Sequence, residues 1–132
     1  NQQKRKPMAN QYKGEIKGNL GGKDRTFRLT FDSIVNIENR TGKSIMNITN
    51  DLALTKYSMK DLVIVLHEAL MGAGSKVVQS AVGDMVIQTG LIKAGVLTGE
   101  VLGTIFTGET KEEDSPLVQG ENEQKNTQSS NT

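Results

Sequence analysis

The run from Tyr57 to Gly72, YSMKDLVIVLHEALMG, is the longest stretch of the chain with apolar residues at helical spacing. Ser58 is a favourable N-cap with Asp61 at the capping-box position, and Gly72 supplies a C-terminal stop. On a helical wheel the apolar side chains fill an arc of roughly 160°, wider than the usual stripe. We therefore predict a central helix on which several other elements pack, through Met59, Leu62, Val63, Val65, Leu66, Ala69 and Leu70.

The composition indicates one small domain with a modest core, because 132 residues contain 35% hydrophobic and 23% charged side chains. A net charge of +1 argues against nucleic acid or an anionic membrane as partner. Without cysteine the chain forms no disulfide, which suits a reducing cytosol. The weakly polar stretch 85–106 contains Gln88, Lys93 and Glu100, so we expect a helix that does not span a membrane.

The ends of the chain differ from its middle. We expect residues 1–8 to be a disordered basic segment, residues 9–108 a single domain, and residues 109–132 a disordered acidic and polar tail. The tail holds six acidic and two basic residues, and its few apolar side chains include Leu117 and Val118. Such a segment buries too little apolar surface to offset its ordering entropy.

Residues 12–20 alternate between two faces, as do residues 27–31, and Gly21 with Gly22 provides turn chemistry between them. The pattern predicts an antiparallel hairpin. Two strands alone are marginal in water, so the apolar face must rest on helices. One edge stays open, with Lys13, Glu15 and Lys17 facing outward, and could accept a partner strand.

Three further helices are predicted from their caps. The first begins at Asp32 or Ser33 and runs through residue 40, and the second is capped by Ser44 and runs to about residue 54. The third follows the central helix, with Ser75 as its cap, and ends near residue 88 before Gly90.

Residues 91–108 are also predicted to be helical, although Gly95, Gly99 and Gly103 recur every four residues. Each glycine costs a helix about 1 kcal/mol relative to alanine, so close packing within the chain or between chains must compensate. The expected fold class is α+β: an N-terminal two-stranded antiparallel hairpin packed on a small bundle of four to five helices.

No catalytic, cofactor-binding or metal site is predicted. Residues 41–44, TGKS, resemble the end of a phosphate-binding loop, but Ile37 stands where that motif needs glycine. His67 and Glu68 begin like a zinc-protease helix, yet Met71 stands where the second histidine belongs. With a single histidine and no cysteine, an enzyme is not expected.

A second apolar strip on the central helix is the candidate partner-binding surface. Ile64 and Met71 lie seven residues apart, away from the main arc, with Lys60 and His67 beside them. Two interpretations stay open. Either the C-terminal helix covers this strip, or the strip is exposed and binds a partner through an adaptable contact.

The order of these features resembles the tail-tube and tail-assembly-chaperone group of phages and gene transfer agents. The resemblance covers residues 9–107 and rests on a hairpin with a short glycine turn, a strand that leads into a helix, and a later helix that ends at glycines. Its motifs are Arg28 to Phe31, Thr41-Gly42, Ser58 to Leu62 and Gly72 to Gly74.

The resemblance implies a tail assembly chaperone in the host bacterial cytoplasm that binds tape-measure and tail-tube proteins. No cofactor is expected, because the residues show no motif for one. Whether the chain also forms a homo-oligomer stays open. The alternatives are a structural component of the virion tail, either tube or adaptor, and an unrelated interaction or regulatory module. A tube subunit needs enough strands for a continuous β-lined ring, and two predicted strands favour the chaperone.

Overall fold

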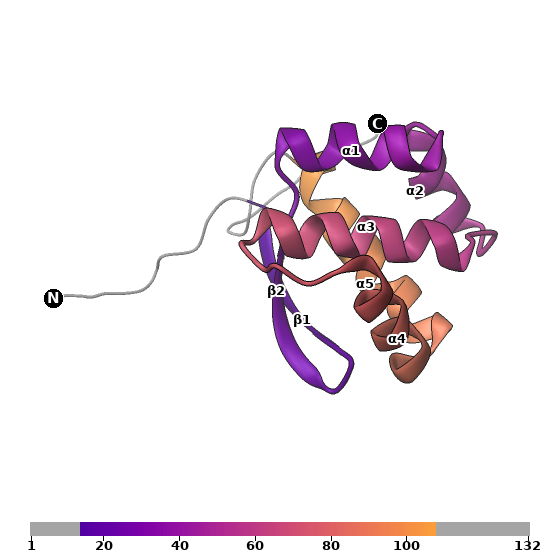
Figure 1. Cartoon of the computed structure of the whole chain (residues 1–132). Helices are drawn as coiled ribbons and strands as arrows, with labels where there is room; N and C mark the ends of the chain where they lie inside the picture. The colour runs from indigo at the N-terminus through magenta and orange to yellow at the C-terminus, as the bar shows by residue number, and fades with distance from the viewer. Residues whose placement is uncertain (1–13, 108–132) are drawn as a thin grey trace, which may run out of the picture.

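The computed structural model describes residues 14–107 (Figure 1). The predicted terminal segments, residues 1–8 and 109–132, lie outside the described residues, as does Lys13. The hairpin and the helices confirm the expected α+β class. The elements are β1 (Glu15–Leu20), β2 (Lys23–Arg28), α1 (Phe31–Thr41), α2 (Ile45–Ala53), α3 (Met59–Gly72), α4 (Gln79–Thr89) and α5 (Leu91–Thr107).

The hairpin turn has two residues, because Leu20 pairs with Lys23 in the antiparallel register. Gly21 and Gly22 both have positive φ, 66° and 81°, which glycine adopts without steric cost. Leu20 and Phe27 are fully buried and place the hairpin on the helices. The turn was therefore predictable from its two glycines.

The junction between β2 and α1 differs from the prediction. β2 ends at Arg28, so the second strand does not extend to residue 31. The N-cap of α1 is Thr30, whose hydroxyl accepts a hydrogen bond from the Ser33 amide at 3.0 Å. The expected caps, Asp32 and Ser33, were therefore wrong, because Ser33 forms the other half of a capping box.

Two of the other predicted caps are confirmed. The Ser44 hydroxyl accepts from the Asn47 amide at 3.0 Å and caps α2. The Ser58 hydroxyl accepts from the Asp61 amide at 3.1 Å and caps α3. Ser75 does not cap α4, which begins at Gln79 after an extended N-cap residue without a side-chain cap.

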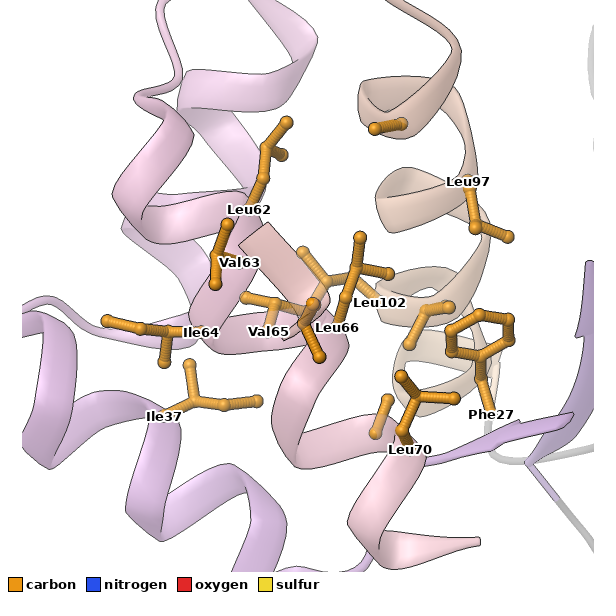
Figure 2. Packing of buried hydrophobic residues seen from close by; sticks show 14 of the residues in the cluster. Phe27, Ile37, Leu62, Val63, Ile64, Val65, Leu66, Leu70, Leu97 and Leu102 are labelled. Atoms are coloured by element: carbon orange, nitrogen blue, oxygen red, sulfur yellow. The ribbon is translucent and has the colours of Figure 1, made fainter. Parts of the chain in front are cut away.

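Helix α3 is the core element, as its wide apolar arc predicted. Every residue from 61 to 70 is buried, and α1, β2, α4 and α5 all pack on the helix. Figure 2 shows Leu66 pointing toward Leu102 of α5, while Ile64 points toward Ile37 of α1. The neighbours of α3 thus enclose it from opposite sides.

Residues 79–107 form two helices with a break at Gly90. No single helix within residues 14–107 is long and apolar enough to cross a membrane; α4 and α5 meet that criterion only as a pair, which is bent by 119°. α5 packs on α3 and β1 through Ala94, Leu97, Val101 and Leu102, all of them buried. The predicted helix is confirmed over Leu91–Thr107, and residue 108 lies outside the described residues.

Gly72 lets the end of α3 approach the junction between β2 and α1. A Cβ at this position would lie 2.1 Å from the Arg28 carbonyl oxygen and 2.8 Å from the Ser33 hydroxyl. The first of these atoms belongs to the backbone and cannot swing away. Gly72 is therefore required by close packing, whereas the end of the helix makes no such demand, since Gly72 does not have positive φ and the C-cap is Ala73.

We predict that Gly72→Ala lowers the free energy of unfolding by about 2 to 3 kcal/mol, because the added methyl group must displace backbone. The matched control is Gly83→Ala inside α4, where an added Cβ meets nothing within 4 Å. That change should raise stability by up to about 1 kcal/mol through helix propensity. Denaturant unfolding measures both values, and equal effects of the two substitutions would show that the close approach is not rigid.

Candidate functional site

The predicted strip on α3 is not an exposed surface. Ile64 is only 3% exposed and lies beside Ile37, so α1 covers it and the expected C-terminal helix does not (Figure 2). Met71 is 39% exposed at the end of α3, and Lys60 is exposed in its first turn. The structure therefore separates these residues and leaves no continuous apolar strip between them. Of the two interpretations left open, coverage holds at Ile64, with α1 in place of the C-terminal helix, and partner binding at Met71, Lys60 and His67 stays a prediction.

His67 belongs to a buried polar network. Its Nε2 donates to the Val77 carbonyl at 2.9 Å, because a carbonyl oxygen can only accept, and its Nδ1 accepts from Arg40 at 3.2 Å. Arg40 also forms an ion pair with Glu68, with Nη1 to Oε2 at 2.7 Å. Asn36 donates to the other Glu68 oxygen at 3.3 Å. Both ring nitrogens of His67 are thus engaged in holding α1, α3 and the following loop together.

Arg40→Met should lower the free energy of unfolding by about 2 to 4 kcal/mol, because it leaves the buried Glu68 carboxylate without its charged partner. The double variant Arg40→Met/Glu68→Met should recover most of this loss, since it removes the buried charge as well. Thermal or denaturant unfolding of the two variants tests the network. A double variant as unstable as the single one would show that packing, and not charge, is what Arg40 contributes.

The segment that resembles a phosphate-binding loop has a structural role. Gly42 is the left-handed C-cap of α1, with φ of 72°, and Ser44 caps α2. Lys43 Nζ lies 2.7 Å from Asp61 Oδ2 and 3.4 Å from Asp51 Oδ2. The hydrogen bond to Asp61 raises the pKa of Lys43, so the pair stabilises the fold below the ordinary lysine pKa and is lost as pH rises through the raised value.

Metal binding has no support within residues 14–107, where no group of three or more His, Asp or Glu side chains could hold an ion. His67 and Glu68 instead pair with Arg40 of α1, and Asp61 pairs with Lys43 of the loop between α1 and α2. A different kind of candidate site, an apolar groove, lies on the described surface.

An apolar groove of about 380 Å³ runs between α2 and α5, and we call it the α2–α5 groove. Its walls come from the end of α2, the following loop and the first half of α5. The lining residues are Thr49, Leu52, Ala53, Thr55, Tyr57, Ile92, Gly95, Val96 and Gly99. Its size suits several apolar side chains of a partner segment.

Glycines shape this groove in two ways. A Cβ on Gly95 would lie 2.6 Å from the Tyr57 hydroxyl oxygen, and that hydroxyl donates to the Leu91 carbonyl at 3.3 Å. Gly95 therefore packs within the chain. A Cβ on Gly99 or Gly103 would meet nothing within 4 Å. These two glycines leave the α5 backbone open to a close approach from outside.

A line of apolar and small residues extends from the groove along α5. Ile92 is 75% exposed, Val96 61% and Phe106 46%, with Gly99 and Gly103 between them in the sequence. Their spacing of four, three, four and three residues places them on one face of the helix. We call Ile92, Val96, Gly99, Gly103 and Phe106 the α5 stripe. Contiguous exposed apolar surface of this kind marks interaction sites.

Sequence analysis missed the α5 stripe because it treated the three glycines at four-residue spacing as one ladder. The signal was present in the alternating spacing that joins two of those glycines to Ile92, Val96 and Phe106.

The predicted hairpin edge is described by the structure only in part, because Lys13 lies outside the described residues. Glu15 is half-buried and Lys17 exposed, and β1 has no second strand partner among the described residues. Its use by a partner stays a prediction.

The family follows from comparison with known proteins. The model of a family described as phage tail tube protein, GTA-gp10, matches residues 13–108, which is most of the chain and includes all the described elements. The chain therefore belongs to this family of phage tail proteins, and the predicted resemblance is confirmed. Neither the curated proteins nor the solved structures provide a match.

Proposed function

We propose that this member of the phage tail family is an assembly chaperone, a non-catalytic helper in the host bacterial cytoplasm. Its partners are the tape-measure protein and the tail-tube protein, whose apolar segments it covers until they are incorporated. The observation that carries the proposal is the α2–α5 groove with the α5 stripe beside it, an apolar surface on a well-packed body. A helper that masks apolar segments needs such a surface.

The shape of the groove favours a helical segment as its occupant. An amphipathic helix binds a groove by inserting side chains at spacings of three and four residues. The open backbone at Gly99 lets such a helix approach α5 closely, while Leu52 and Tyr57 provide the opposite wall. The tape-measure protein, a long chain in the tails of such phages, is the partner that the resemblance implies.

Non-catalytic action fits the polar groups of the described residues. His67 is bonded through both ring nitrogens, and the carboxylates of Glu68 and Asp61 are paired with Arg40 and Lys43. None of these residues lines the α2–α5 groove. The groove itself offers apolar contact and little chemistry.

A structural component of the virion tail is the second candidate, and the description of the family as a tail tube protein favours it. A tube subunit contributes strands to a continuous β-lined ring. Residues 14–107 contain one two-stranded sheet, and its apolar face is already covered by helices. This architecture supports the chaperone more strongly than the tube subunit.

Co-expression with the tape-measure protein of the same phage tests the proposal. Val96→Lys should reduce the co-purified tape-measure protein by about tenfold or more, because a charge would be desolvated at the centre of the contact. The matched control is Ile87→Lys on α4, which changes a residue of similar exposure, 67%, outside the groove. The control should retain the wild-type amount, and both variants should unfold like the wild type.

Equal retention by both variants would show that the groove is not the binding site, and no retention by the wild type would remove the main support for a chaperone. Mass spectrometry of lysates and purified particles separates the two candidate functions. A chaperone is found in the lysate and is missing from particles. Stoichiometric amounts in particles would favour the structural component.

A further inference from the structure

The α5 stripe has the pattern of a helix–helix seam. Its residues repeat at alternating intervals of four and three, which is the spacing of the core positions in a two-stranded coiled coil. Two large residues, Ile92 and Val96, come first, and two glycines follow them. No described side chain or backbone atom outside α5 comes within 4 Å of a Cβ built on Gly99 or Gly103. The seam is therefore open along its middle.

The order of large and small residues makes the seam complementary to itself. When a second copy of α5 runs antiparallel, with the two-fold axis level with the midpoint between Leu97 and Thr98, Val96 lies opposite Gly99 of the second copy. In the same register Ile92 lies opposite Gly103 of the second copy. Each large side chain thus packs over a glycine, which allows the two backbones to approach closely.

Charges beside the seam fit the same register. Lys93 and Glu100 lie seven residues apart on the same flank of the stripe, and neither has an ion-pair partner within residues 14–107. In the antiparallel arrangement Lys93 faces Glu100 of the second copy, and symmetry repeats the pair. In a parallel arrangement Lys93 of one copy does not face Glu100 of the other, because the flank that carries both residues faces the opposite flank of the second copy. Size and charge therefore select one orientation.

We propose that the chain pairs with a second copy of itself through the α5 stripe, with antiparallel helices and two Lys93–Glu100 ion pairs. Pairing would cover Ile92, Val96 and Gly99, which also line the α2–α5 groove. The second copy then competes with the partner segment for the same surface. This competition rests on the proposed function, whereas the pairing itself does not.

Sedimentation equilibrium of the full chain at low salt tests the pairing. Lys93→Glu and Glu100→Lys should each weaken the dimer by about tenfold, because each places two pairs of like charges across the seam. The double variant Lys93→Glu/Glu100→Lys should restore the wild-type dissociation constant, since it exchanges the two partners. Lys60→Glu, an equal charge change on the exposed start of α3, is the control and should have no effect.

A wild-type chain that stays monomeric at millimolar concentration overturns the pairing, and so does a double variant that is as weak as the single ones. Circular dichroism confirms that the variants fold, as expected for exposed positions. The two proposals fail separately. A monomer that retains the tape-measure protein overturns only the pairing, and a dimer that retains none overturns only the proposed function.

Discussion

Burial of α3 on all sides is the constraint on which the rest of the structure depends. A helix that is apolar around most of its circumference must be enclosed, and α1, the hairpin, α4 and α5 each cover part of it. The polar groups within residues 61–70 of this helix are buried with it and must be paired, as Glu68 is with Arg40 and Asp61 is with Lys43. Gly72 permits the closest of these approaches.

The helices that enclose α3 each bury one face against it, and their outer faces stay available to bind a partner. α5 buries one face against α3 and β1, and its opposite face carries Ile92, Val96 and Phe106 in exposed positions. Helix α2 stands beside this face and completes the α2–α5 groove. The core and the proposed binding surface are therefore on opposite sides of the same helix. Changes at the stripe can alter binding without removing core contacts.

Local features of the sequence predicted most of the fold. The cap at Ser58 depends only on the three residues that follow it, and the hairpin turn depends only on its own two glycines. Both were therefore predicted from the sequence. Tertiary coverage was not predictable in the same way. A helical wheel shows that Ile64 is apolar, but it does not show that Ile37 lies over it. For the same reason the glycines of α5 looked equivalent, although Gly95 alone among them meets Tyr57.

Site-specific photo-crosslinking during tail assembly tests the central claim, which is that the α5 stripe and not the end of α3 is the contact surface. A benzophenone amino acid is placed at Val96 in one strain and at Met71 in another. The account predicts adducts with the tape-measure protein at position 96, adducts with a second copy when the tape-measure gene is deleted, and neither at position 71. Adducts at position 71 without any at position 96 would contradict it.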